Sequence, residues 1–293
     1  MASTASVEQL DLRASGFVFR ACAAGPADGE PVLLLPGMPE TSAMWIDVMR
    51  HRAELGYRCV APDQRGYSPG ARPSEIAEYS HSRLAADVLN IASAAGFGRF
   101  NLVAHDWGAA IGWAAVDIDT DARIVSYTAL SIPHYRGFAE ATRDDPSVES
   151  YRKILAQFLN PDSGIVERWS ANDFGALRSI WGGHDDALAE QYLSVFRQDG
   201  ALDAALNWYR ATNGHMSVLD GSSLAFGPVS IPTMVIWGNR DPAVSRMAVD
   251  IGRTHIAGPH EFVELEAGHW LVQEEPDIVR TLIERQLARH PAR

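Results

Sequence analysis

The sequence predicts an α/β protein whose mostly parallel, twisted sheet is flanked by helices and interrupted by one helical insertion. Short apolar runs that end in turn residues alternate with longer helical patterns, which is typical of a parallel sheet covered by helices. Most runs are too short for a helix and too continuously apolar for a one-sided strand, so we expect both of their faces to be buried. The runs are PVLLLPG from Pro31, RCVAPD from Arg58, FNLVAHD from Phe100, IVSYTALS from Ile124, IPTMVIWG from Ile231 and EFVELE from Glu261.

Other segments complete this layout. LDLRASGFVFRACAAG reads as two strands joined by Ser15 and Gly16, which predicts an antiparallel hairpin at the sheet edge. SHSRLAADVLNIASAAGFG predicts a helix that ends at Gly96 or Gly98, and a last helix begins near Pro276. The expected buried faces are Leu84, Val88, Ile91 and Ala95 in the first helix, and Val279, Leu282, Ile283 and Leu287 in the last.

The alternation breaks between His134 and Phe226, where the pattern is helical, rich in aromatic residues and without an apolar strand run. Because strand runs resume afterwards, we interpret residues 134–226 as a helical cap inserted into a core of residues 1–133 and 227–293. Some cap aromatics are candidates for lining an apolar pocket, although such residues more often pack inside the cap. They are Phe158, Trp169, Phe174, Trp181, Phe196 and Trp208.

Composition restricts the class of protein. The 293 residues carry a formal net charge of -12, which disfavours nucleic acid as a partner because phosphate binding needs clustered Lys and Arg. No stretch predicts a signal peptide or a membrane span, and Cys22 and Cys59 predict no disulfide framework. We therefore expect a cytoplasmic protein without a membrane partner. The oligomeric state stays open, a homodimer included.

The segment LVAHDWGAAIGW carries the strongest chemical signal. It predicts a buried strand, a tight turn at Asp106, and a helix whose first turn contains Gly108. A side chain on such a turn projects from the top of the sheet, and its neighbours must be small because backbones crowd there. The helix N-terminus that follows favours negative charge. Asp106 therefore reads as a nucleophile, or else as an ordinary helix cap.

At this point the chain resembles the α/β-hydrolase superfamily and, within it, the epoxide hydrolase branch. The matching segments occur in family order and span most of the chain. They are LPGMPETSAMW near Pro36, APDQRGYSPG near Asp63, LVAHDWGAA near Asp106, LNWYRA near Tyr209, WGNRDPAV near Asp241 and EAGHWLVQEEP near His269.

The residue at the turn sets the reaction type that the resemblance implies. The family usually carries serine there, whereas a carboxylate displaces a leaving group at a saturated carbon and leaves an alkyl ester. The resemblance implies that the substrate is a small apolar epoxide and that Asp106 forms this ester with it. It implies that His269, oriented by Asp241, activates the water that releases a vicinal diol. The backbone N–H groups of Met38 and Trp107 would form the oxyanion hole, with no metal or cofactor.

Other histidines read differently from His269. None of the ten has a metal-ligand spacing such as H-E-x-x-H. His105 and His134 lie near the site in sequence, where a packing role is at least as plausible as a functional one. Five others sit in polar contexts typical of solvated surface, namely His51, His81, His255, His260 and His290.

A proton donor must reach the epoxide oxygen, and epoxide hydrolases supply two cap tyrosines for this purpose. The segment A-L-N-W-Y-R matches the second of these, Tyr209. The first position falls on Ile154, which is a departure from the family. Tyr151 lies one helical turn away and is either its substitute or a packed residue. Tyr151, Ile154 and Trp208 are therefore candidates for the substrate pocket.

Three alternatives remain at this stage. Haloalkane dehalogenases also place Trp after the nucleophilic Asp, but they commonly add an Asn donor where this chain has Met38. A hydrolase of specialised metabolism would act on another electrophile, and the missing first tyrosine keeps that alternative open. A non-catalytic binding protein would keep the fold and use the pocket as a receptor.

Overall fold

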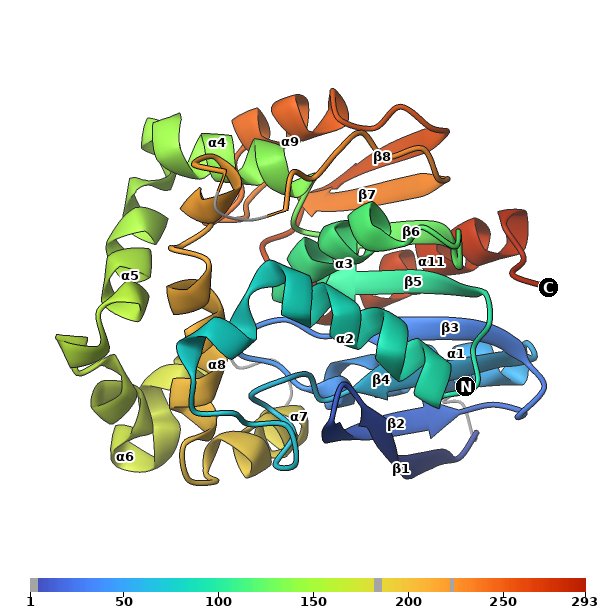
Figure 1. The fold of residues 1–293 in the computed structure, drawn as a ribbon, viewed down its shortest axis with the longest axis horizontal. Helices are drawn as coiled ribbons and strands as arrows, with labels where there is room; N and C mark the ends of the chain where they lie inside the picture. Colours follow the sequence, from blue (N-terminus) through green and yellow to red (C-terminus); the bar gives the residue numbers. More distant parts are fainter. Residues whose placement is uncertain (1–4, 182–185, 222–223) are drawn as a thin grey trace.

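The computed structural model describes residues 5–181, 186–221 and 224–293. Within them, eight strands form one sheet in the order β1-β2-β4-β3-β5-β6-β7-β8 (Figure 1). The pairs β1–β2 and β2–β4 are antiparallel and all other pairs are parallel, which confirms the predicted fold class. The strands are β1 Val7–Ala14, β2 Phe17–Ala24, β3 Glu30–Leu35, β4 Tyr57–Pro62, β5 Phe100–His105, β6 Ile124–Leu130, β7 Thr233–Gly238 and β8 His260–Leu265.

Each predicted apolar run forms one of the strands β3 to β8, and the predicted hairpin is β1–β2. The expectation that both faces are buried is wrong for β8, whose residues are half-buried or exposed. This strand lies at the sheet edge and pairs only with β7. Its outward glutamates pair with arginines, as Glu261 does with Arg285 and Arg289.

Helices cover both faces of the sheet. Figure 1 shows α2 and α3 on one face, with α1 and α11 on the other. Leu84, Val88 and Ile91 of α2 are buried as predicted, whereas Ala95 at its C-cap is half-buried. All four apolar residues predicted for the last helix are buried. The bounds are η1 Ser42–Trp45, α1 Ile46–Glu54, η2 Ile76–Tyr79, α2 His81–Ala94, α3 Trp107–Ile118, α9 Arg246–Arg253, α10 Leu271–Glu274 and α11 Pro276–Arg289.

The segment between β6 and β7 forms a group of helices that lies to one side of the sheet (Figure 1). We refer to it as the insertion. Its first helix, α4, packs against α9 of the core. The insertion comprises α4 Tyr135–Asp144, η3 Pro146–Val148, α5 Glu149–Leu159, η4 Pro161–Ser163, α6 Ile165–Ile180, α7 Asp186–Phe196, α8 Ala201–Ala211 and η5 Met216–Val218.

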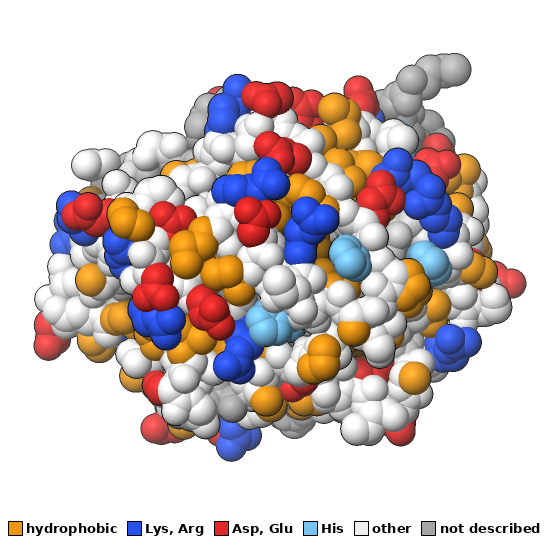
Figure 2. Space-filling view, turned by 90° about the horizontal axis from the view of Figure 1, so that it is seen from above, with side chains coloured by type: hydrophobic (Ala, Val, Ile, Leu, Met, Phe, Trp, Pro, Cys, Tyr) orange, Lys and Arg blue, Asp and Glu red, His pale blue; other side chains and the backbone are white. Residues whose placement is uncertain are grey.

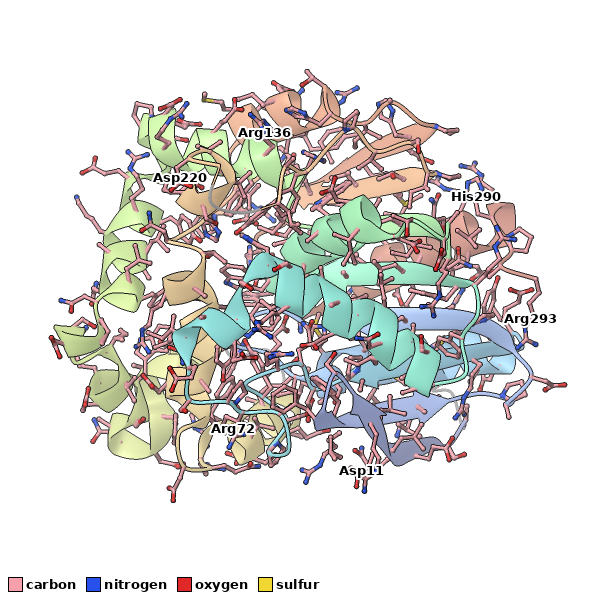
Figure 3. The ribbon with its side chains drawn as sticks, viewed as in Figure 1. Asp11, Arg72, Arg136, Asp220, His290 and Arg293 are labelled. Atoms are coloured by element: carbon pink, nitrogen blue, oxygen red, sulfur yellow. The ribbon has the colours of Figure 1, made fainter. Side chains whose placement is uncertain are left out.

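Hydrogen bonds attach the insertion to the loops of the core. The Trp208 indole N–H of α8 donates to the carbonyl oxygen of Arg65 at 2.8 Å. Arg72, labelled in Figure 3, donates to the Gln198 side chain and to the carbonyl oxygen of Asp199, each at 3.3 Å. The insertion is therefore fixed over the sheet at several points.

The surface carries mixed charge. Among the described residues on the face in Figure 2, acidic and basic side chains intermingle with small hydrophobic groups. Cys22 and Cys59 are both free and buried. In the described part of the chain, every helix is too short or too polar to cross a membrane.

The junction of β5 and α3 is a strained turn at Asp106. This residue has φ 50° and ψ -123°, a conformation that costs a non-glycine residue about 1–3 kcal/mol. Glycines make room around it. A Cβ atom on Gly37 would lie 2.4 Å from the Asp106 Cβ, and one on Gly108 would lie 2.5 Å from the carbonyl oxygens of Leu35 and Pro36. The surrounding chain therefore accepts no side chain at either glycine.

We expect Gly108→Ala to lower the free energy of unfolding by about 1–3 kcal/mol, because the added methyl group meets backbone atoms that cannot rotate away. Gly98→Ala is the matched control, since its Cβ would meet no atom within 4 Å. Urea unfolding of both variants tests this expectation. Equal stability of the two variants would contradict the packing described for the turn.

Candidate active site

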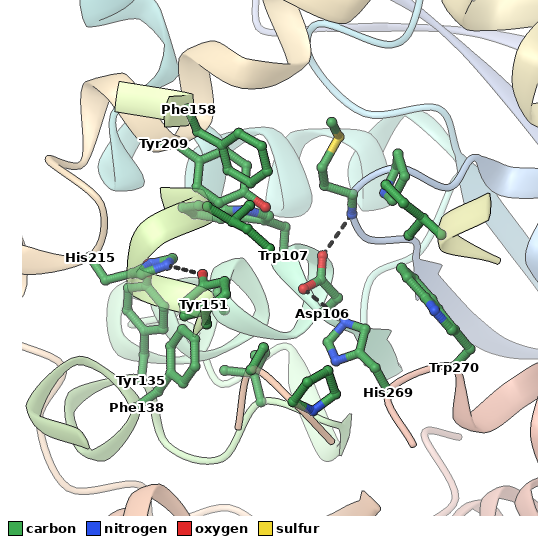
Figure 4. A pocket seen from close by; sticks show the side chains of 18 of the residues that line it. Asp106, Trp107, Tyr135, Phe138, Tyr151, Phe158, Tyr209, His215, His269 and Trp270 are labelled. Carbon is green, nitrogen blue, oxygen red and sulfur yellow. Dashed lines mark hydrogen bonds and ion pairs between the residues drawn. The ribbon is translucent and has the colours of Figure 1, made fainter. Parts of the chain in front are cut away.

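Three loops that follow parallel strands bring Asp106, Asp241 and His269 together. Figure 4 shows Asp106 beside His269. The Nδ1 atom of His269 lies 2.7 Å from Asp241 Oδ2, and its Nε2 atom lies 3.3 Å from Asp106 Oδ2. One imidazole ring thus bridges two carboxylates. In such an arrangement the histidine can move a proton beside one carboxylate while the other carboxylate orients the ring.

Ser131 joins this group, although no sequence motif identifies it. It follows β6 with φ 69°, and its hydroxyl donates to Asp241 Oδ2 at 2.9 Å. The backbone N–H groups of Ala243 and Val244 donate to the other oxygen, at 2.8 and 3.1 Å. Both oxygens of the Asp241 carboxylate therefore have hydrogen-bond donors besides His269, and the carboxylate is fixed in position.

Charge pairing sets the protonation of the two facing groups. Burial alone would raise the pKa of Asp106, but the hydrogen bond and charge of His269 outweigh burial and lower it. Burial would likewise lower the pKa of His269, yet the charge of Asp241 and the hydrogen bond to Asp106 raise it well above its ordinary value. Asp106 is thus held as a carboxylate in an apolar setting.

Backbone donors also face Asp106. The N–H group of Met38 donates to Asp106 Oδ1 at 2.7 Å. Trp107 is the first residue of α3, so its N–H group lies at a helix N-terminus, where no carbonyl of the helix accepts it. The loop that carries Met38 is held by Gln64, whose side chain donates to the carbonyl oxygen of Pro36 at 2.7 Å.

A second buried pair lies directly beneath the site. His105 and Glu40 are both fully buried, with Nδ1 of the ring 2.9 Å from Glu40 Oε2. The other ring nitrogen lies 2.9 Å from the carbonyl oxygen of His269. Both ring nitrogens of His105 therefore have a hydrogen-bond partner. Glu40 also accepts from Tyr192 of the insertion and from Gln273.

The insertion and these loops enclose a cavity of about 260 Å³ above Asp106. Tyr151 and Ile154 line it, together with Tyr209 and the aromatic residues Phe158 and Trp169. Most of the remaining wall is also apolar. Its polar groups are the Asp106 carboxylate, the imidazoles of His269 and His215, and the hydroxyls of Tyr135, Tyr151 and Tyr209.

Trp208 does not line the cavity, contrary to the sequence expectation. Adjacent residues of a helix point about 100° apart, so only one of Trp208 and Tyr209 can face the cavity. Tyr209 does so, while Trp208 is buried and bonds to the core. Phe174, Trp181 and Phe196 are also buried away from the cavity lining.

The tyrosines on the insertion side each have a nitrogen neighbour (Figure 4). Burial raises the pKa of Tyr209 well above its ordinary value, and a hydrogen bond from the Trp107 side chain opposes this rise. The Tyr151 hydroxyl lies 2.7 Å from Nε2 of His215, and the Tyr135 hydroxyl contacts Nδ1 of the same ring. Neither His215 nor Tyr135 was identified from the sequence, since no motif marks them.

The interpretation of His81 as surface is wrong. It is 1% exposed, and its ring packs against Tyr135 and Phe226 with centroids 5.0 and 5.4 Å away. Its polar sequence context gave no sign of these remote aromatic partners. His134 is buried and stacks on His255 at 4.7 Å, outside the cavity lining.

Comparison with known proteins agrees with this architecture. Residues 30–276 match the family described as having the alpha/beta hydrolase fold. The AB hydrolase superfamily protein YfhM of Bacillus subtilis is 31% identical over 277 residues, covering 92% of this chain and 94% of that protein. Epoxide hydrolase A of Mycobacterium tuberculosis is 28% identical over 312 residues, covering 92% and 94%.

A solved structure from a study of novel epoxide hydrolases in metagenomes from hot environments superposes with a TM-score of 0.83. It is 26% identical and covers 97% of this chain and 99% of its own. The fold and the site define an α/β hydrolase with an aspartate at the strand-to-helix turn. The chain belongs to the α/β-hydrolase fold family and is an enzyme of its epoxide hydrolase-like branch.

We expect Glu40→Ala to lower the free energy of unfolding by about 1–3 kcal/mol, because it leaves the side chains of His105, Tyr192 and Gln273 without the buried carboxyl group that they contact. Glu149→Ala is the control, since Glu149 pairs with Lys153 at the surface, at 2.8 Å. Urea unfolding measures both. If Glu40→Ala were as stable as the parent, the expected contribution of this buried pair to stability would be refuted.

Proposed function

We propose that this protein hydrolyses an epoxide to a vicinal diol through a covalent ester on Asp106, without a cofactor. One observation carries the proposal: an ionised Asp106 faces the phenol groups of Tyr209 and Tyr151 across an apolar cavity. Opening an epoxide needs a nucleophile at carbon and an acid at oxygen, placed on opposite sides of the ring. In this reading the insertion is the cap that closes the substrate cavity.

In the first step, an Asp106 oxygen attacks a ring carbon of the epoxide. The carbon–oxygen bond to Asp106 forms while the ring carbon–oxygen bond breaks. The released alkoxide takes the phenol proton of Tyr209. Met38 N–H holds Oδ1, so Oδ2, which lies 3.3 Å from His269 Nε2, is the attacking atom and Oδ1 becomes the ester carbonyl oxygen.

In the second step, water attacks the ester carbonyl carbon. Ester formation removes the negative charge of Asp106, which is one of the groups that raise the pKa of His269. The pKa of His269 therefore falls, and the ring becomes able to take a proton from water while Asp241 holds Nδ1. The oxyanion then develops on Oδ1, where Met38 N–H already donates and Trp107 N–H is near. When the oxyanion collapses, the bond between the carbonyl carbon and Oδ2 breaks and the departing diol oxygen takes the proton from His269. The remaining proton of the water, now on the restored carboxyl group, returns to the Tyr209 phenolate.

The dehalogenase alternative is less well supported. A halide site needs donors, and the Trp107 indole N–H is used by the Tyr209 oxygen. Met38 offers no side-chain donor, and its sulfur instead accepts from the Tyr67 hydroxyl at 3.3 Å. A phenol acid beside the nucleophile suits an alkoxide leaving group better than a halide.

We expect a single turnover of styrene oxide in heavy-oxygen water to place one heavy oxygen atom in the peptide that contains Asp106, because water attacks the enzyme's own carbonyl. In His269→Gln, ester hydrolysis should slow by about 10²–10⁴-fold, so that the ester accumulates as added mass on the intact protein. Mass spectrometry measures both results.

An unlabelled Asp106 peptide after turnover would refute the covalent route. Halide release from bromobutane, with no diol from styrene oxide or cyclohexene oxide, would identify a dehalogenase. Asp106→Asn distinguishes an enzyme from a non-catalytic binding protein. In an enzyme, this variant should lose turnover, while styrene oxide still binds and raises the unfolding temperature. A ring-closed or rearranged product would instead indicate a hydrolase of specialised metabolism.

Asp106→Asn also mimics the neutral ester. We expect the pKa of His269 in this variant to fall below its value in the parent, because one of the two carboxylates that stabilise the imidazolium is gone. Histidine nuclear magnetic resonance titration measures this shift, with the exposed His260 as an internal reference. An unchanged or higher pKa of His269 would contradict the proposed switch from ion-pair partner to base.

A further inference from the structure

The wall of the cavity opposite His269 contains a second histidine to which the reaction above assigns no role (Figure 4). Both ring nitrogens of His215 contact tyrosine hydroxyls, Nε2 that of Tyr151 and Nδ1 that of Tyr135. The rings of Phe138 and Trp107 pack around it, with centroids 4.9 and 5.1 Å away. The imidazole is thus held in one orientation inside an aromatic enclosure.

The backbone that presents His215 is strained. After α8 ends at Ala211, the residues Asn213, Gly214 and His215 have φ values of 49°, 57° and 78°. Consecutive left-handed residues are uncommon, and those other than glycine cost free energy that is usually retained where function requires the geometry. This turn brings the ring back toward the cavity.

The hydrogen bonds that His215 can make depend on how many protons its two ring nitrogens carry. Burial lowers the pKa of His215 to about 3, so the ring is neutral and carries one proton. Tyr135 is fully buried, and its hydroxyl can donate to Nδ1. In the tautomer that this donation requires, the ring proton lies on Nε2, which donates to the Tyr151 oxygen at 2.7 Å. One lone pair of that oxygen is then occupied, and the hydroxyl proton of Tyr151 is free to point into the cavity.

We propose that His215 is a positioning residue that directs the Tyr151 hydroxyl proton into the cavity, so that Tyr151 serves as the second acid for the epoxide oxygen. This inference rests on the proposed function. Tyr209 has the same arrangement, because the Trp107 side chain hydrogen-bonds its oxygen. Each phenol therefore has a nitrogen donor behind it. Tyr151 supplies the acid that the chain lacks at Ile154.

The proton balance of the step is simple. As the ring carbon–oxygen bond breaks, both phenols hydrogen-bond the alkoxide oxygen, which takes one proton, from Tyr209 or from Tyr151. When Tyr151 gives the proton, an O–H bond forms on the alkoxide oxygen and the Tyr151 phenolate keeps the electron pair. Burial raises the pKa of Tyr151 well above its ordinary value, so this phenolate needs stabilisation, which Nε2–H of His215 gives. When the ester is hydrolysed, a proton from the attacking water returns to Tyr151.

The test measures ester formation and ester hydrolysis separately, by rapid quench of single turnovers of styrene oxide. His215→Phe and Tyr151→Phe should each slow ester formation roughly ten- to a hundredfold. The double variant should form the ester no more slowly than Tyr151→Phe, because both substitutions disable the same acid. Hydrolysis of the ester should be unchanged. His215→Gln, whose amide offers both a donor and an acceptor, should restore ester formation to within a few-fold.

His134→Phe is the matched control, because His134 is also buried with a pKa lowered to about 3 but lies outside the cavity lining. It should leave ester formation unchanged. The inference is overturned if the losses in His215→Phe and Tyr151→Phe multiply in the double variant. It is also overturned if His215→Phe forms ester as fast as the parent or faster, as expected if Tyr151 donates to the ring. A parent protein that forms no ester on Asp106 would refute the proposed function itself.

Discussion

The strained turn at Asp106 is the constraint on which the rest of the site depends. One residue with φ 50° connects a fully buried strand to a helix that is buried from Trp107 to Ala115, so its side chain has a single direction available. That direction requires glycine at positions 37 and 108 and brings the carboxylate to Met38 N–H and His269. The free energy stored in the turn must be offset by packing around it, and the buried strands on either side of β5 supply that packing.

Alternating charge explains how a carboxylate remains ionised beside an apolar cavity. From Asp241 inward, the order is carboxylate, His269, and the Asp106 carboxylate, with the His105–Glu40 pair below. The charge of His105 also helps to lower the pKa of Asp106. Because these charges act on one another, ester formation in the proposed reaction would remove one charge and change the pKa of the next group. The arrangement that keeps Asp106 ionised in the resting state would thus prepare His269 to act as the base in the following step.

The sheet, its order of segments and the Asp106, Asp241 and His269 loops could be predicted because each depends on local sequence, namely an apolar run followed by a turn. The predictions that were wrong concern residues whose surroundings come from distant parts of the sequence. His81 lies in a polar stretch, but Phe226 and Tyr135 come from elsewhere in the chain to cover it. The prediction that Trp208 lines the pocket was wrong, because a sequence motif does not show which side of its helix faces the cavity. Ser131 and His215 belong to no local pattern.

Tyr151 lies one helical turn from Ile154, the position where the family resemblance implies a tyrosine. Tyr151 and Ile154 are three residues apart on α5, so they share a face but are displaced by about 4.5 Å along the helix axis. A phenol displaced this far meets new neighbours, and His215 on its strained turn is the neighbour that bonds it. Ile154 is 45% exposed although it lines the cavity, so its position lies where the cavity meets the surface. In the proposed reaction, an apolar side chain there favours entry of an apolar substrate, while the polar groups proposed to act on it stay deeper inside.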